Sequence, residues 1–172
     1  GSIALKSLEE RKVPIRNPNQ VFATIDHIVD TFPGRGDKTL MPSGSDFIRS
    51  LRASVKGSKI HFFDIDDPNQ GIVHVVSPEQ GIALPGITYI CPDSHTCSLG
   101  ALGTLAWGVG STECEHALAT NTLIKKKPKL MKIMVDGILP LGVTSKDIIL
   151  HLISQHGADG AKDHAIEFMG SV

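Results

Sequence analysis

The sequence predicts an α/β fold in which three layers, α/β/α, are built around a largely parallel sheet. Short β-rich runs alternate with helical patterns along the chain, and this alternation is typical of parallel sheets covered by helices. The chain has 172 residues, 41% of them hydrophobic, which is enough to bury the core of one domain. We expect an N-terminal extension or truncated lead-in over residues 1–20 and one α/β domain segment over residues 21–172.

The predicted strands are short β-rich runs that end at turn residues. They cover residues 21–25, 59–63, 86–91, 130–135 and 164–168. Residues 71–80 form a short apolar segment that fits either a helix or a strand. The loop from Phe32 to Ser45 is rich in Gly and Pro, and we interpret it as a connection between elements.

Three helices are predicted from apolar spacing and from end signals. The first covers residues 46–55 and has Ser45 as its candidate N-cap. The second opens with a capping-box pattern at Thr112–Glu115 and continues into the basic run at residues 125–129, where lysines complement the helix dipole. The third follows a similar pattern at Thr144–Asp147 and ends at Gly157, the residue type that favours a helix C-terminus.

Composition excludes several classes of partner. The net charge of −1 provides no general field that would attract nucleic acid or an anionic membrane. No apolar run approaches the roughly 18 residues needed to span a bilayer, and the N-terminus lacks the pattern of a signal peptide. We therefore expect a cytoplasmic protein that binds neither nucleic acid nor membrane.

The three cysteines, Cys91, Cys97 and Cys114, are interpreted as free thiols. Their number is odd and none are spaced as C-x-x-C, which argues against a disulfide framework. The same spacing argues against a zinc or iron–sulfur site made by this chain alone, so we expect no bound metal.

Acidic and imidazole side chains follow two predicted strands. Asp26 and His27 come after the first strand, and Asp93-Ser94-His95 comes after the strand at residues 86–91. Ligands of α/β folds gather at the carboxyl ends of strands, and Glu167 lies within a further strand. A carboxylate beside an imidazole fixes its tautomer and raises its basicity, so these residues are candidates for general acid–base catalysis.

Several of these residues also fit purely structural roles. Asp26 fits an Asx-stabilised turn, His74 fits a partly buried structural histidine, and Ser94 fits a helix N-cap. A hydrolase triad is excluded because the members of such a triad are distant in sequence, whereas Asp93, Ser94 and His95 are consecutive. No G-x-S-x-G motif is present either. The glycines of Gly108-Val109-Gly110 are interpreted as sites of close backbone packing, because the full dinucleotide-binding fingerprint is missing.

Several motifs in order carry a family resemblance. They are Ala23–His27, Gln70–Glu79, Pro85–Thr96, Glu115–Leu123, Gly142–Asp147 and Ile166–Gly170. Together they resemble the aconitase superfamily, and within it the large subunits of 3-isopropylmalate dehydratase, the isopropylmalate isomerase of leucine biosynthesis. The resemblance identifies the chain as an internal fragment of such a hydro-lyase.

The resemblance implies dehydration and rehydration of a small, isopropylmalate-like diacid. It implies a [4Fe–4S] cluster in the full-length enzyme, but none of the three cysteines matches the family's cluster ligands. It also implies a partner, either a small subunit or a swivelling C-terminal domain. We expect the isolated chain to be inactive, because the cluster cysteines and the small domain are missing, and to form homo-oligomers through exposed apolar surface.

The resemblance also assigns residue roles. Asp26 pairs with His27, Asp93 with His74 and Glu167 with His95; His27 protonates the departing hydroxyl, and Ser94 binds a substrate carboxylate. Two alternatives remain open. The first is a non-catalytic module that binds carboxylates or a partner chain, and the second is a mononuclear metal hydrolase built on His27, His74 and His95.

Overall fold

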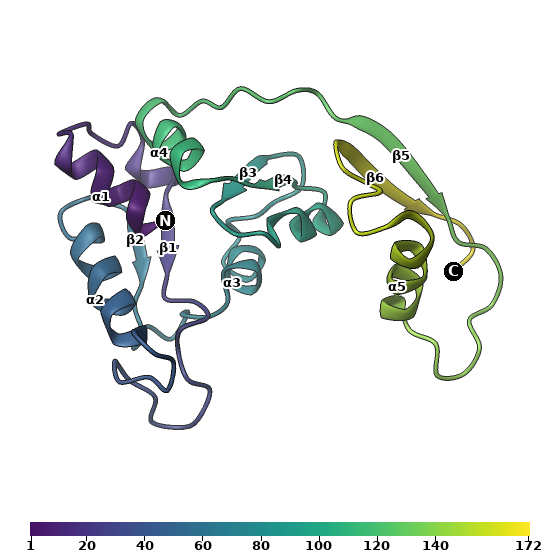
Figure 1. Ribbon diagram of the computed structural model, residues 1–172, viewed down its shortest axis with the longest axis horizontal. Coiled ribbons are helices and arrows are strands. Elements are labelled where there is room, and N and C mark those ends of the chain that lie inside the picture. Colours follow the sequence, from purple (N-terminus) through teal and green to yellow (C-terminus); the bar gives the residue numbers. More distant parts are fainter. The chain divides into compact units, whose positions relative to one another are not determined.

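The chain folds as two units, which are residues 1–123 and residues 124–172 of a computed structural model that describes all 172 residues (Figure 1). The first unit contains α1 (Ser2–Glu10), a 3₁₀ turn (Pro18–Gln20), β1 (Phe22–Thr24), α2 (Gly44–Val55), β2 (His61–Phe63), α3 (Val73–Glu79), β3 (Thr88–Cys91), a 3₁₀ segment (Thr96–Leu102), β4 (Leu105–Gly108) and α4 (Ser111–Thr120). The second unit contains β5 (Lys129–Met134), α5 (Ser145–His156) and β6 (His164–Met169). None of the helices has the length and apolar character needed to cross a membrane.

Every strand pairs in parallel with one neighbour. β1 pairs with β2, β3 with β4 and β5 with β6, which makes three two-stranded sheets. The predicted α/β class with parallel strands is confirmed, and all five predicted strands are present within a few residues. The strand β4 was not predicted, because its four residues include Ala106 and Gly108, which are poor strand formers.

One core cluster of the first unit lies beside β1 and β2. Ile25, Ile48 and Ile65 are buried there, and Ile28, Val29, Leu51 and Phe62 pack against them. Ile48 comes from α2, so the amphipathic face of this helix covers the β1–β2 pair. The cluster anchors Ile25, which lies between the end of β1 and Asp26.

A second core cluster joins α1 to α4. Ala4, Val109 and Cys114 are buried, and Ile90, Trp107, Leu118 and Leu123 pack around them. Arg11 also forms an ion pair of 2.6 Å with Glu115 at the surface of the two helices. Residues of α1 therefore contribute to the core of the first unit. The predicted lead-in at residues 1–20 and the predicted domain segment at residues 21–172 stay predictions.

The predicted start of α2 is wrong by two residues. Its N-cap is Ser43, in a left-handed conformation with φ of 63°, and Ser45 lies inside the helix. The Ser45 hydroxyl donates instead to the carbonyl of Asp37, at 2.6 Å, and so ties the preceding loop to the helix. This loop is a connection, as predicted, and Arg52 holds it through an ion pair with Asp37.

Both predicted ends of α4 are wrong. The capping interaction is two residues earlier than predicted, because the N–H of Gly110 donates to Glu113 Oε2 at 3.2 Å. The helix ends at Thr120, since Asn121 adopts a left-handed conformation with φ of 58°. The basic run at residues 125–129 therefore does not extend this helix, and its last residue begins β5.

The structure resolves the ambiguity at residues 71–80 in favour of a helix, α3. The prediction for α5 is confirmed: the N–H and hydroxyl of Thr144 both donate to Asp147 Oδ2, at 2.7 and 2.8 Å. Gly157 ends α5 with φ of 77°, which L-residues rarely adopt.

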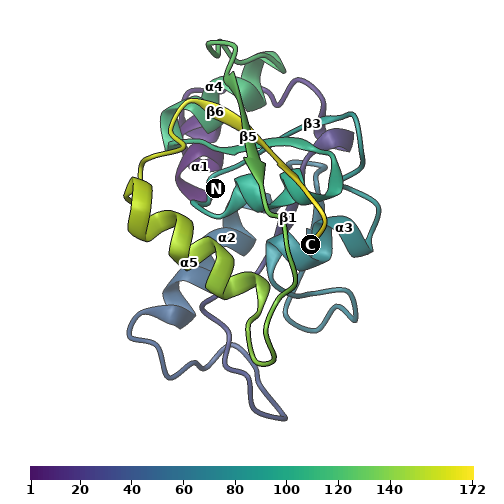
Figure 2. The ribbon, with the colours of Figure 1, turned by 90° about the vertical axis from the view of Figure 1, so that its right-hand side faces the viewer.

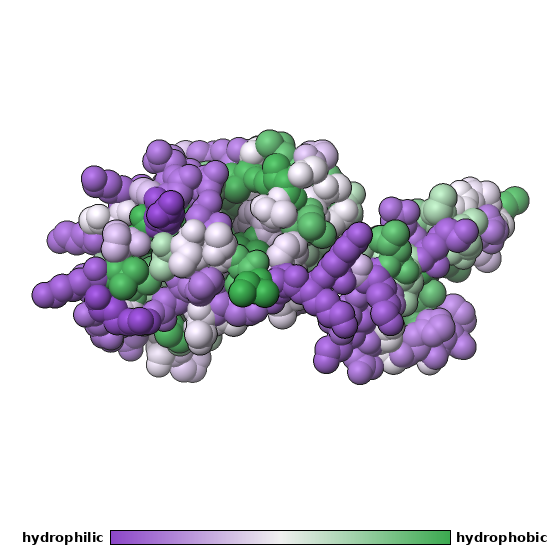
Figure 3. Space-filling view, turned by 90° about the horizontal axis from the view of Figure 1, so that it is seen from above, coloured by the Kyte–Doolittle hydropathy of each residue, from purple (hydrophilic) through white to green (hydrophobic).

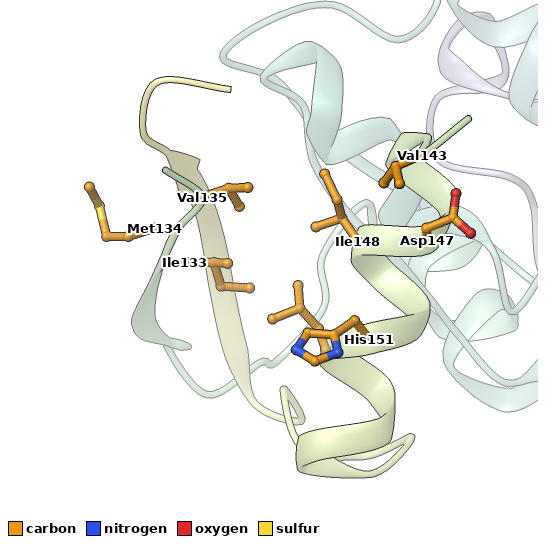
Figure 4. A pocket seen from close by; sticks show the side chains of 8 residues that line it. Ile133, Met134, Val135, Val143, Asp147, Ile148 and His151 are labelled. Atoms are coloured by element: carbon orange, nitrogen blue, oxygen red, sulfur yellow. The ribbon is translucent and has the colours of Figure 1, made fainter. Parts of the chain in front are cut away.

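The second unit has an open apolar interior. Figure 2 shows α5 beside the β5–β6 pair, and Figure 4 shows Ile133 and Val135 of this region facing Ile148 of α5, while Met134 points away. No residue of this unit is fully buried, and Leu130, Ile138 and Leu141 are almost completely exposed. Hydrophobic surface is visible on both units in Figure 3.

Candidate functional site

The predicted site residues of the first unit follow the carboxyl ends of two strands. β1 ends at Thr24, and the buried Ile25 separates it from Asp26 and His27. β3 ends at Cys91, two residues before Asp93. The placement of both motifs after strands, predicted from the sequence, is therefore confirmed.

Asp26 lies behind the exposed ring of His27. Asp26 Oδ1 is 3.1 Å from His27 Nδ1, in ion-pair contact without hydrogen-bond geometry, and the side chains are 15% and 76% exposed. The other carboxylate oxygen, Oδ2, accepts the N–H of Val73 at 3.0 Å. The turn itself is closed by main-chain atoms, because the N–H of Val29 donates to the carbonyl of Asp26 at 3.2 Å. The carboxylate is thus directed to His27 and to α3.

His74 of α3 forms a second acid–histidine pair with Asp93. His74 Nε2 is 2.7 Å from Asp93 Oδ1, and the side chains are 13% and 17% exposed. The hydrogen bond from His74, with a second from the N–H of His95 at 2.8 Å, holds the pKa of Asp93 below its usual value. With Asp93 ionised, Nε2 carries the proton and Nδ1 of a neutral His74 presents a lone pair.

Two atoms of these pairs are buried without a hydrogen-bond partner. They are Asp26 Oδ1 and His74 Nδ1, and the third such side-chain atom in the chain is Trp107 Nε1. Buried polar atoms in folded proteins are nearly always satisfied, and exceptions often mark functional sites. A purely structural role for His74 does not explain why its second ring nitrogen lacks a partner.

Ser94 and His95 extend from the same turn into solvent. Ser94 Oγ is 3.2 Å from His95 Nδ1, which is also 3.5 Å from Asp93 Oδ1. Ser94 does not cap a helix, because the 3₁₀ segment begins at Thr96 with His95 as its N-cap. The buried Thr96 fixes this turn by donating to the carbonyl of Asp93 at 2.7 Å.

A shallow hollow lies beside the turn. Its lining residues are Pro92, Asp93, Ser94, Gly108 and Val109. A Cβ atom at Gly108 would lie only 2.5 Å from the carbonyl oxygen of Asp93, so the close-packing interpretation of Gly108 is confirmed. The same interpretation is wrong for Gly110, where a Cβ atom would meet nothing within 4 Å.

Glu167 lies on β6 of the second unit, in register with Lys132 of β5. Its side chain is exposed within that unit. The pairing of Glu167 with His95, which belongs to the first unit, stays a prediction.

The cysteines do not fit a [4Fe–4S] cluster. Burial raises the pKa of Cys91 to about 11, helped by the nearby Asp93 carboxylate, and burial also raises the pKa of Cys114. Cluster ligands are thiolates held close together around the metal, and the three cysteines are not grouped in this way. No group of three or more His, Cys, Asp or Glu side chains is arranged to hold a metal ion, so His27, His74 and His95 do not form the metal site of the hydrolase alternative. All three cysteines are free, as predicted.

Sequence reasoning missed the role of α3 as the link between the two pairs. The N–H of Val73 binds Asp26, and the neighbouring His74 binds Asp93. The Val73–Asp26 contact joins residues 47 positions apart through a main-chain atom, so no side-chain pattern signals it.

Comparisons with known proteins agree with this picture. The aconitase family (aconitate hydratase) matches residues 1–172. The 3-isopropylmalate dehydratase large subunit 1 of Bradyrhizobium diazoefficiens is 47% identical over 171 residues, which are 99% of this chain and 35% of that protein. The large subunit 1 of Mannheimia succiniciproducens is 43% identical over 169 residues, and the large subunit of Staphylococcus saprophyticus is 44% identical over 167.

The last two alignments cover 98% and 97% of this chain and 36% of each relative. The chain therefore spans about a third of the length of these curated relatives. Because the family match extends over all 172 residues, the chain belongs to the aconitase family.

Proposed function

We propose that this chain forms one side of the active site of a 3-isopropylmalate dehydratase large subunit. The observation that carries the proposal is the presence of two acid–histidine contacts, Asp26–His27 and His74–Asp93, each just after the carboxyl end of a strand. The names of the relatives support the same reaction, which is the dehydration and rehydration of 3-isopropylmalate in leucine biosynthesis.

His27 is the proposed general acid. Its ring is exposed, and the Asp26 carboxylate behind it stabilises the protonated imidazolium. In dehydration, His27 gives its proton to the departing hydroxyl, which leaves as water. The adjacent carbon loses its proton to a base that we assign to the small subunit. In rehydration, His27 takes a proton from the incoming water while the remaining hydroxyl bonds to one alkene carbon, and the base of the small subunit returns its proton to the other carbon.

Ser94, His95 and the second pair are proposed to hold the diacid. Ser94 is exposed at the hollow beside Gly108, where its hydroxyl can donate to a substrate carboxylate. His74 is oriented by the Asp93 carboxylate, which its Nε2 contacts at 2.7 Å, and through Asp93 it supports the turn that carries Ser94. We further propose that Glu167 of the second unit orients His95 in the assembled enzyme.

The proposed enzyme needs more than this chain. The resemblance implies a [4Fe–4S] cluster, and because the cysteines present are not grouped to hold one, we assign its ligands to the rest of the longer protein. The relatives are named large subunits, which supports a small subunit as the partner. We therefore propose a cytoplasmic, two-subunit enzyme in which this chain alone has no dehydratase activity.

A chimeric enzyme tests the proposal, because a relative supplies the segments that this chain does not include. The 171 aligned residues of the Bradyrhizobium large subunit are replaced by this chain, and the chimera is expressed with that organism's small subunit. After anaerobic reconstitution, we expect isomerisation of 3-isopropylmalate. The substitution His27→Asn should then lower kcat by about 10²- to 10⁴-fold, which is the usual contribution of a general acid.

His116→Asn is the matched control, because His116 is an exposed histidine of α4 outside the site. It should leave kcat unchanged. A chimera that assembles with its small subunit yet has no turnover would reject the proposal, and so would a His27→Asn variant as active as its parent.

A further inference from the structure

The two acid–histidine pairs depend on the position of one short helix. α3 has seven residues, includes Pro78 and has no side-chain hydrogen bond at its N-cap. A helix of this length is not stable alone, so contacts with the rest of the unit must determine where it lies. Its first turn provides Val73 for Asp26 and His74 for Asp93.

A hydroxyl pair connects α3 to β3. Ser77 Oγ lies 2.6 Å from the carbonyl oxygen of Val73 and 2.8 Å from the hydroxyl of Tyr89. A carbonyl oxygen only accepts, so the single proton of the Ser77 hydroxyl is donated to Val73. Tyr89 must then be the donor to Ser77. Ser77 is 2% exposed, and burial raises the pKa of Tyr89, so the phenol keeps this proton at neutral pH.

The two contacts between α3 and the β3 region share one helix face. Ser77 and His74 are three residues apart on α3, which places them on the same side of the helix. Their partners, Tyr89 and Asp93, are four residues apart on β3 and the turn that follows it. The Tyr89–Ser77 contact therefore adds a second fixed point to the His74–Asp93 contact.

We propose that Tyr89 and Ser77 are positioning residues that hold α3 so that both acid–histidine pairs form. The hydrogen bonds run from Tyr89 to Ser77 to the Val73 carbonyl, and the N–H of the same Val73 binds Asp26. Their importance for catalysis rests on the proposed function. Their effect on the geometry of the two acid–histidine pairs can be measured without it.

The test uses the 172-residue chain with the substitutions Tyr89→Phe, Ser77→Ala and both together. Carbon-13 NMR follows the titration of the Asp93 carboxyl, and hydrogen exchange follows the Val73 amide. We expect the pKa of Asp93 to rise toward its ordinary value and Val73 exchange to become at least about 10-fold faster. Because the two hydroxyls act in series, the double variant should match the single variants rather than add their effects.

Thr104→Val is the matched control. Thr104 is also buried, and its hydroxyl makes one hydrogen bond of 2.9 Å, to the carbonyl of Leu84. This variant should lower the melting temperature without moving the Asp93 titration. The proposal is overturned if Tyr89→Phe and Ser77→Ala behave as Thr104→Val does, which would show a merely structural role. Since no readout involves substrate, failure of the proposed reaction would leave this result unchanged.

Discussion

His74 Nε2 lies 2.7 Å from Asp93 Oδ1, although the two residues are 19 positions apart and belong to different elements. The contact joins the first turn of α3 to the turn after β3, and it lowers the pKa of Asp93. Its strength can therefore be measured through the pH dependence of stability.

Asp93→Asn should reduce the loss of stability in acid. Because the folded-state pKa of Asp93 is below the unfolded value of about 3.9, its carboxylate stabilises the folded chain above that pH. The contribution is lost as pH falls through the folded-state pKa. At pH 7 we expect the variant to cost about 1–3 kcal/mol in free energy of unfolding, since His74 loses a charged partner.

Urea unfolding at pH 7 and at pH 3 checks this expectation. The wild type should lose more free energy of unfolding between the two values than Asp93→Asn does. Asp66→Asn, at an exposed carboxylate of the same unit, is the control and should follow the wild type. Identical pH profiles for all three proteins would show that the His74–Asp93 contact does not stabilise the fold.

Gly108→Ala should displace the turn that carries Ser94. The new Cβ atom would lie 2.5 Å from the carbonyl oxygen of Asp93, so β4 and the turn must move apart. Overpacking of this kind typically costs about 1–3 kcal/mol. Thermal unfolding and the NMR shifts of the Ser94 and His95 amides measure the two effects.

Gly100→Ala is the control for this substitution, because a Cβ atom at Gly100 meets nothing within 4 Å. We expect it to change the free energy of unfolding by less than about 0.5 kcal/mol. If both variants are equally stable and their amide shifts stay in place, the close approach of Gly108 to Asp93 is not a constraint.

Local signals account for the parts of the fold that the sequence predicts well. α5 is specified by contacts within its own first turn, Thr144 to Asp147, and by Gly157 with its positive φ at the end. The end of α4 was missed because Asn121, not Gly or Pro, takes the left-handed conformation there. Asn adopts this conformation more readily than most residues, but its presence alone does not predict a helix end.

The candidate site likewise has a part that local sequence patterns predict and a part that they do not. The positions of Asp26 and Asp93 after strands follow from local patterns, and the structure confirms those positions. The contact of Asp26 with the Val73 amide and the Tyr89–Ser77 contact depend on tertiary packing. They join residues on separate elements, so neither periodicity nor spacing predicts them.

The three thiols should differ sharply in reactivity. Cys97 is exposed, whereas Cys114 is buried and the pKa of the half-buried Cys91 is raised to about 11. Thiolates are the reactive species, so Cys91 stays unreactive until the pH approaches its raised pKa. At pH 7.5 we expect iodoacetamide to modify one thiol quickly, and mass spectrometry of peptides should locate it at Cys97. Rapid labelling of all three in the folded chain would contradict their burial.

The isolated chain should bind malate-like diacids only weakly, with a Kd above about 1 mM. The exposed groups that we propose to meet such a ligand in the first unit are the Ser94 hydroxyl and the His27 and His95 rings, and the Asp26 and Asp93 carboxylates beside them would repel its carboxylates. A few exposed hydrogen bonds do not offset the loss of translational and rotational freedom on binding. Titration calorimetry at pH 7 measures the affinity, with Ser94→Ala as the variant that removes the proposed carboxylate donor. Micromolar binding that Ser94→Ala abolishes would instead favour a non-catalytic carboxylate-binding module, because the site would then be complete without the remaining two thirds of the relatives' length.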